Sequence, residues 1–125
     1  MNNRIYTGGS RGIGSRYEDM AAAYLEGHGG IVLQRNFSCR TGEVDIIARD
    51  GDYLVFVEVK YRRTTAHGDP FEAVSVKKQR RIIGAALYYM SKHRISPDTP
   101  IRFDVIGISG DGRVAHLRNA FTAGL

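Results

Sequence analysis

The sequence of 125 residues predicts a single α/β domain in which helices pack on a mixed β-sheet. Two segments, 16–26 and 75–93, repeat apolar residues at helical spacing. Five shorter segments are rich in aromatic and β-branched residues and are bounded by turn residues. The elements follow the order αβββαββ, which indicates a sheet flanked by helices.

The first helix is expected from about Arg16 to Glu26, before a run of glycines. Residues 1–14 carry four glycines and two arginines and are expected to form a flexible N-terminal arm. Residues 15–125 would then form one folded domain. The residues expected in the buried stripe of this helix are Tyr17, Met20, Ala21, Tyr24 and Leu25.

Three consecutive strands are expected next, at 31–37, 43–49 and 53–61. Asp50 and Gly51 form a turn signal that makes the second and third strands an antiparallel hairpin. After a loop at 62–72, Ser75 is expected to cap the second helix. Strands at 101–108 and 113–119 complete the sheet. The apolar face expected for the second helix consists of Val76, Ile83, Ala86, Leu87 and Met90.

Three charged residues interrupt the apolar hairpin: Asp45, Glu58 and Lys60. Charge in an apolar strand is costly unless it is paired or holds a metal. Because strand side chains alternate, Glu58 and Lys60 should share a face, roughly 7 Å apart. Asp45 falls opposite residues 56–58 once the hairpin closes, so the two carboxylates should converge.

The same alternation predicts which side chains of the second strand share a face. One set is Val44, Ile46 and Ala48, and the other is Glu43, Asp45 and Ile47.

Two carboxylates and an ammonium group are what Mg²⁺-dependent phosphodiester cleavage requires. The structural alternative is a salt-bridged strand face. The apolar run before Glu58 indicates a covered central strand and favours a functional site.

Two further polar residues have two interpretations each. Glu18 lies beside the apolar stripe of the first helix and could be an additional metal ligand, but Ser15-x-x-Glu18 is also a capping box. Gln79 lies within the apolar stripe of the second helix and could bond a site carboxylate, water or phosphate. It could equally bond backbone in the first turn of its own helix.

Basic residues near these elements are candidates for phosphate contacts: Arg62, Arg63, Lys77, Lys78 and Arg81. The last three are expected on the solvent-facing side of the second helix, where a plain solvated face explains them equally well. Asp104 interrupts the fourth strand and is expected either to pair with a basic residue or to support the site.

Composition narrows the class of partner and the compartment. A net charge of +5 suits an anionic partner such as nucleic acid. Cys39 is the only cysteine, so no internal disulfide can form, and the cytoplasm is expected. The N-terminal residues show no signal-peptide pattern, and no apolar run is long enough for a membrane span.

The motifs Gly-Glu-Val-Asp-Ile-Ile and Val-Phe-Val-Glu-Val-Lys-x-Arg resemble those of the bacterial YraN-type family of predicted endonucleases. That family belongs to the PD-(D/E)XK nuclease superfamily and is similar to archaeal Holliday-junction resolvases. The resemblance covers about 14–121 and includes Gly14-x-x-x-Glu18 and Lys78-Gln79-Arg80-Arg81-Ile82. It departs from the superfamily pattern at Val44, where proline is common, and at Ile83, where a RecB-like tyrosine would stand.

The resemblance implies a restriction-endonuclease-like fold and a Mg²⁺-dependent endonuclease, with Mn²⁺ as an alternative ion. Asp45, Glu58, the Val59 carbonyl and Glu18 would hold the metal, Lys60 would align the attacking water, and Gln79 would lie nearby. The expected partner is nucleic acid, most of all branched or structured DNA. Symmetric cutting of a four-way junction would require a homodimer. The alternative function is a non-catalytic nucleic-acid-binding module on the same fold.

Overall fold

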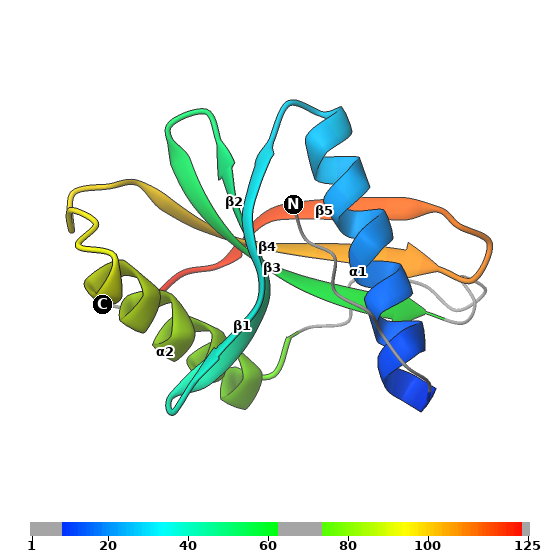
Figure 1. The fold of residues 1–125 in the computed structure, drawn as a ribbon, viewed down its shortest axis with the longest axis horizontal. Helices are drawn as coiled ribbons and strands as arrows, with labels where there is room; N and C mark the ends of the chain where they lie inside the picture. Colours follow the sequence, from blue (N-terminus) through cyan, green and yellow to red (C-terminus); the bar gives the residue numbers. More distant parts are fainter. Residues whose placement is uncertain (1–8, 63–73, 124–125) are drawn as a thin grey trace.

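The computed structural model of the chain describes residues 9–62 and 74–123, with side chains from Arg16 onward. Two helices and five strands make a mixed α/β fold, as predicted (Figure 1). The elements are α1 (Gly9–Gly27), β1 (Ile31–Cys39), β2 (Gly42–Asp50), β3 (Tyr53–Arg62), α2 (Val76–Lys92), β4 (Ile101–Ser109) and β5 (Val114–Phe121).

The strands form one sheet in the order β1-β2-β3-β4-β5. The β1–β2, β2–β3 and β4–β5 pairs are antiparallel, whereas β3 and β4 are parallel and are connected through α2. The Asp50–Tyr53 pair closes the predicted hairpin, and Gly51 at its turn has a φ of 60°. A left-handed φ favours glycine, which explains the strength of the turn signal.

Each helix covers one face of the sheet. Leu54 and Phe56 of β3 pack in the cluster that contains α2, whereas Val55 and Val57 pack in the cluster that contains α1. The predicted alternation along β3 is therefore confirmed. The predicted stripe of α1 is also confirmed, with Ala21 and Leu25 fully packed in this second cluster.

The first helix starts earlier than predicted. It begins at Gly9, so residues 9–14, which were expected in the flexible arm, are helical. Glycine's low helix propensity makes such a segment look like a break, and the prediction was wrong for this reason. Residues 1–8 lie outside the described part of the chain. Neither described helix is long and apolar enough to cross a membrane.

The second helix is capped as predicted, but its buried face is rotated. The Ser75 hydroxyl accepts a hydrogen bond from the Lys78 N–H at 3.1 Å. Val76 and Leu87, expected in the core, are 60% and 47% exposed. The face that carries Tyr89 is buried instead, and this ring packs against Phe37 and Phe56 of the sheet. The buried residues are Ile82, Ala85, Ala86, Tyr89 and Met90.

The alternation predicted for β2 fails at one residue. Val44 packs with Ile47 on the α2 side, whereas Ile46 and Ala48 pack on the α1 side. The strand pair changes faces between the Arg35–Ile46 and Phe37–Val44 pairs, where Asn36 has a φ of 53°. Asparagine adopts this left-handed conformation more readily than most residues. A single asparagine does not interrupt the strand pattern in the sequence, so the pattern gives no sign of the irregularity.

Glycines allow α2 to approach β2 closely. A Cβ on Gly42 would lie 1.8 Å from the Arg81 carbonyl oxygen, and a Cβ on Gly84 would lie 2.7 Å from the Thr41 carbonyl oxygen. Both contacts are with backbone, which cannot move aside as a flexible side chain can. The close spacing between α2 and β2 therefore requires residues without a Cβ at both positions.

Gly42→Ala should therefore destabilise the protein by about 3 kcal/mol or more, because the helix must shift away from the sheet. Gly27→Ala is the matched control, since nothing lies within 4 Å of a Cβ at Gly27. Urea unfolding monitored by circular dichroism measures both variants. Equal stability of the two variants would contradict the close approach of α2 to β2.

Candidate functional site

The candidate site lies where β2 separates from β3. Pairing between these strands runs from Asp50–Tyr53 to Ile46–Val57 and ends there, although β3 continues along β4 as far as the Arg62–Ser109 pair. The Val59 N–H donates to the Asp45 Oδ2 at 2.8 Å. A side-chain carboxylate thus replaces the carbonyl that a continued strand ladder would supply.

Separation of the strands brings the two predicted carboxylates together. The carboxyl groups of Asp45 and Glu58 lie close enough for each to change the pKa of the other, and Glu58 is only 9% exposed. In an extended strand the N–H and C=O of one residue point toward the same neighbour. The Val59 carbonyl therefore faces the side on which Asp45 lies.

The pair is electrostatically strained. Burial and the negative charge of Asp45 raise the pKa of Glu58 from its ordinary 4.5 to about 8. Burial also raises the pKa of Asp45, against the effect of the hydrogen bond from Val59. Two adjacent buried carboxylates cannot both ionise without cost. At neutral pH the pair therefore retains a proton.

Two lysines stand near this pair, at different distances. The Lys78 Nζ lies 3.8 Å from the Glu58 Oε2 and 3.6 Å from the Glu43 Oε2. Lys60 also lowers the pKa of Glu58, but less than Lys78 does. In the described part of the chain Lys60 makes no ion pair with a carboxylate. The structure thus places a residue predicted for DNA contact, Lys78, at the carboxylates themselves.

The prediction that Lys77, Lys78 and Arg81 share the solvent face of α2 holds for Lys77 and Arg81, which are exposed, and is wrong for Lys78. Lys78 and Arg81 both reach the sheet, where Arg81 donates to the Glu43 Oε1 at 2.9 Å. Lys78 lies one turn before buried Ile82, so the rotated stripe of α2 points it at β2 and β3. Lys77 is exposed and Arg62 ends β3, while Arg63 lies outside the described residues.

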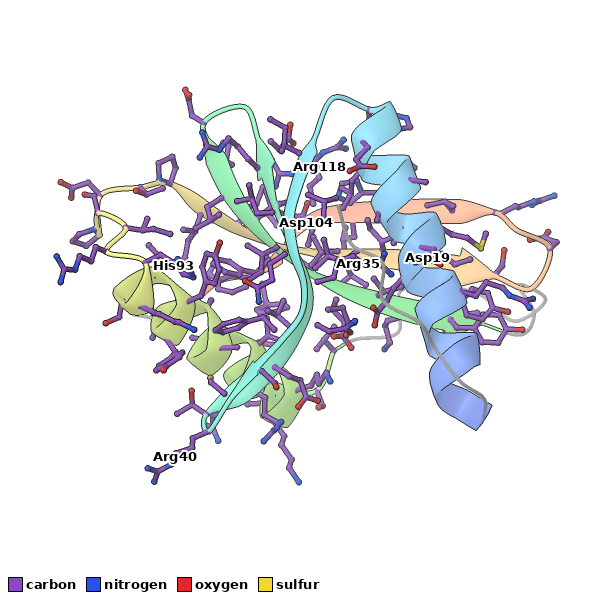
Figure 2. The ribbon with its side chains drawn as sticks, in the orientation of Figure 1. Asp19, Arg35, Arg40, His93, Asp104 and Arg118 are labelled. Carbon is purple, nitrogen blue, oxygen red and sulfur yellow. The ribbon has the colours of Figure 1, made fainter. Side chains whose placement is uncertain are left out.

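Glu18 pairs with an arginine of β1. Because α1 begins at Gly9, Ser15 lies inside the helix and the capping-box interpretation is wrong. Glu18 lies 3.7 Å from the Arg35 Nη2, and the same guanidinium donates to Asp19 at 2.6 Å (Figure 2). Arg35 thus holds Glu18 toward β1, on the α1 side of the sheet. A metal-ligand role for Glu18 stays a prediction.

Gln79 follows its structural alternative. Its Nε2 donates to the Val74 carbonyl at 2.9 Å, so the amide bonds backbone at the start of its own helix. A role for Gln79 near the carboxylates stays a prediction.

Asp104 belongs to a separate network on the α1 side of the sheet. Fully buried, it accepts hydrogen bonds from the Arg102 guanidinium, at 2.9–3.3 Å, and from the Asn119 N–H at 2.9 Å. His116 Nε2 lies 2.7 Å from the same carboxylate, and His116 Nδ1 lies 3.2 Å from the Tyr24 hydroxyl. Of the two predictions for Asp104, pairing with a basic residue is confirmed.

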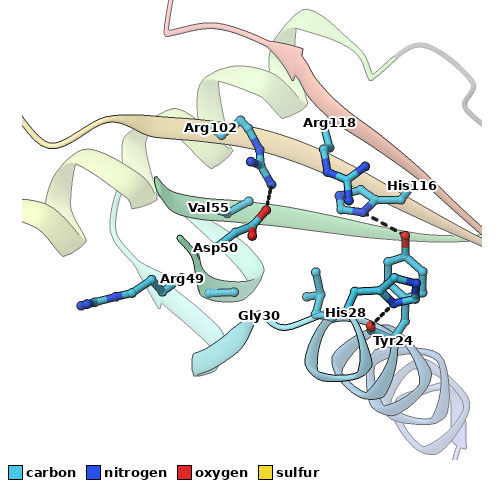
Figure 3. A pocket seen from close by; sticks show the side chains of 11 residues that line it. Tyr24, His28, Gly30, Arg49, Asp50, Val55, Arg102, His116 and Arg118 are labelled. Atoms are coloured by element: carbon cyan, nitrogen blue, oxygen red, sulfur yellow. Dashed lines mark hydrogen bonds and ion pairs between the residues drawn. The ribbon is translucent and has the colours of Figure 1, made fainter. Parts of the chain in front are cut away.

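This network borders a hollow of about 320 Å³ that opens to solvent (Figure 3). Arg102 also donates to Asp50 at 2.9 Å, whereas Arg49 points away from the other side chains. The register between β4 and β5 shifts at Phe103/Val105, and Asp104 bonds the Asn119 N–H that this irregularity leaves over. The network therefore joins β5 to β4. Spacing along the chain gave no signal for the contribution of His116 or Tyr24.

The donors at the strand separation suit a hard divalent cation. Mg²⁺ is usually held by one or two carboxylates and keeps several waters, and Asp45 and Glu58 supply two. The mutual repulsion of these carboxylates would be relieved by a cation between them. Within residues 16–62 and 74–123, no three His, Cys, Asp or Glu side chains are grouped to hold a metal. The groups that could hold such a cation are the two carboxylates and the Val59 carbonyl.

Fold and site define an α/β protein with an acidic pair, one member of it buried, at the separation of two central strands and near two lysines. The chain belongs to the family described as "Uncharacterised protein family UPF0102", whose model matches residues 17–108. It is 52% identical over 113 residues to a UPF0102 protein of Geobacter sulfurreducens, covering 87% of this chain and 88% of the relative. A UPF0102 protein of Lachnoclostridium phytofermentans is 47% identical over 106 residues, with 85% and 89% covered.

Replacing Glu58 with an uncharged residue should stabilise the protein in EDTA. A carboxyl whose pKa is raised on folding binds a proton in the folded state that the unfolded state releases, so stability falls as pH rises from about 4.5 to 8. Glu58→Gln should remove this fall and gain on the order of 2 kcal/mol above pH 8. Thermal unfolding across this pH range measures the gain.

Glu43→Gln is the control. Its effect on the pH dependence of stability should have the opposite sign, because the hydrogen bond from Arg81 lowers the pKa of Glu43. Its contribution is present above the ordinary pKa and is lost as pH falls through the lower folded value. If the Glu58→Gln variant were no more stable than the wild type at pH 8, the raised pKa of Glu58 would be contradicted.

Asp104→Asn should destabilise the protein by about 3 kcal/mol, since Arg102 and His116 lose a buried anionic partner. Despite its burial, hydrogen bonds from His116 and Arg102 lower the pKa of Asp104 below its ordinary 3.8. Its contribution should therefore be present above about pH 4 and decline as pH falls further. Urea unfolding at pH 3 and 7 tests this, with exposed Asp98→Asn expected to change stability by less than about 0.5 kcal/mol.

Proposed function

We propose that this protein is a metal-dependent endonuclease that hydrolyses phosphodiester bonds in nucleic acid. The observation that carries the proposal is the pair of Asp45 and buried Glu58 at the strand separation, with Lys60 two residues beyond Glu58 on the same strand. A buried carboxyl with a strongly raised pKa beside a second carboxyl is costly to maintain and is characteristic of functional sites.

The fold supports the proposal as well. A five-stranded mixed sheet with one helix on each face suits the restriction-endonuclease-like architecture that the hairpin motifs suggested. The site motif lies on a central β-hairpin, and the parallel strand β4 supports β3 behind it. Catalytic groups on rigid central strands are held more precisely than groups on loops.

Each residue of the site would have a distinct role in the reaction. Asp45, Glu58 and the Val59 carbonyl would hold Mg²⁺ or Mn²⁺, which when bound polarises the phosphate and favours ionisation of water. Lys60 would align the attacking water in line with the leaving oxygen and stabilise the charge that develops on phosphorus. The Val59 N–H fixes Asp45 in the orientation that ligand binding needs.

The substrate is proposed to be DNA, in branched or structured form, in the cytoplasm. The net charge of +5 favours association with a polyanion. Exposed Lys77 and the cations Arg62 and Arg81 would contact phosphates and position the backbone without reading its bases. Symmetric cutting of a junction would use a homodimer.

Asp45→Ala and Lys60→Ala should each reduce cleavage by at least about a hundredfold. The measurement uses labelled single-stranded, duplex, flap and four-way DNA, with RNA counterparts, in Mg²⁺, Mn²⁺ or EDTA. Asp45→Asn is included because it keeps an acceptor for the Val59 N–H, and Asp98→Ala is the control. Circular dichroism verifies that each variant is folded.

Cleavage by both variants at the wild-type rate would refute the assignment of the site. Salt-dependent binding of the same substrates without any metal-dependent cut would instead identify a nucleic-acid-binding module on this fold.

A further inference from the structure

The lysine nearest to the candidate metal ligands is not the one on their strand. Lys78 lies in the first turns of α2, and its ammonium is within 4 Å of Glu58 and of Glu43. Glu43 belongs to β2 and Glu58 to β3, so Lys78 bridges the two strands at the point where they separate. It is the cation closest to the acidic pair among the described residues.

Several structural features hold Lys78 in this place. Ser75 caps α2 and accepts the Lys78 N–H, and the close approach of Arg81 to Gly42 fixes the helix against β2. The side chain is 34% exposed, compared with 11% for Glu58. The ammonium can therefore leave toward solvent without unfolding any element, whereas Glu58 cannot follow it.

We propose that Lys78 substitutes for the metal in the metal-free protein and is released to contact a substrate phosphate when a divalent cation binds. The proposal rests on the proposed function, since it concerns the same site. A divalent cation held by Asp45 and Glu58 would repel an ammonium at this distance. A phosphate group of the nucleic acid would attract it, so Lys78 changes partners while Lys60 remains available to water.

The inference couples two binding events through one side chain. With metal absent, Lys78 is occupied by Glu43 and Glu58 and adds nothing to nucleic-acid affinity. With metal present, it is displaced and adds a phosphate contact. Metal and nucleic acid would thus each strengthen the binding of the other, because the metal displaces the lysine that a phosphate then contacts.

Lys78→Met is compared with Lys77→Met, which removes the same charge from the adjacent, exposed position on α2. Mg²⁺ binding without nucleic acid is measured by calorimetry at pH 9, where proton competition is small. Loss of the competing ammonium should tighten Mg²⁺ binding by about tenfold in Lys78→Met, against roughly twofold or less in Lys77→Met. Lys78→Gln serves as a second uncharged variant with a shorter side chain.

Oligonucleotide binding is then measured in Ca²⁺, which replaces Mg²⁺ as a divalent ion, and in EDTA. Lys78→Met should weaken binding several-fold in Ca²⁺ and leave it unchanged in EDTA, whereas Lys77→Met should weaken it equally in both. The same Mg²⁺ affinity in both variants, or the same loss in Ca²⁺ and EDTA for Lys78→Met, would overturn the inference alone. Absence of Mg²⁺ binding by the wild-type protein would overturn the proposed metal site together with it.

Discussion

The hydrogen bond from the Val59 N–H to the Asp45 carboxylate is the interaction on which the site depends. A strand that leaves its neighbour exposes N–H groups, and a buried N–H without an acceptor is costly. Asp45 satisfies this donor with a side chain, so β2 can diverge without that cost. The aspartate that permits the divergence is also one of the two carboxylates of the candidate site.

The placement of α2 adds a second constraint. Without side chains at Gly42 and Gly84, the helix lies close enough to β2 for cations at its N-terminal end to reach the sheet. Lys78 and Arg81 consequently reach Glu43, and Lys78 also reaches Glu58, although both cations remain partly exposed. The two glycines thus decide the electrostatics of the acidic pair, although neither contacts it, because they determine which positive charges can approach.

Much of this arrangement could be predicted from sequence, because it depends on local chemistry. Strand alternation and the Asp50-Gly51 turn were sufficient to place Asp45 near Glu58, and apolar periodicity located α2 and its Ser75 cap. The remainder depends on tertiary packing. The rotation of α2, which points Lys78 inward, follows from which stripe fills the core best. The exchange of faces at Val44 follows from Asn36 on a neighbouring strand, and the partners of Asp104 come from β5.

The hairpin that carries Asp45 and Glu58 is built from contacts between residues close in the chain, whereas β3 meets β4 only after the whole of α2 intervenes. Short-range pairings form faster than long-range parallel ones. We therefore expect the acidic pair to assemble early during folding, while still hydrated, and to be desolvated only when β4 and α2 dock. The cost of desolvating the two carboxyl groups is then incurred in the last steps of folding, after their positions in the hairpin are already fixed.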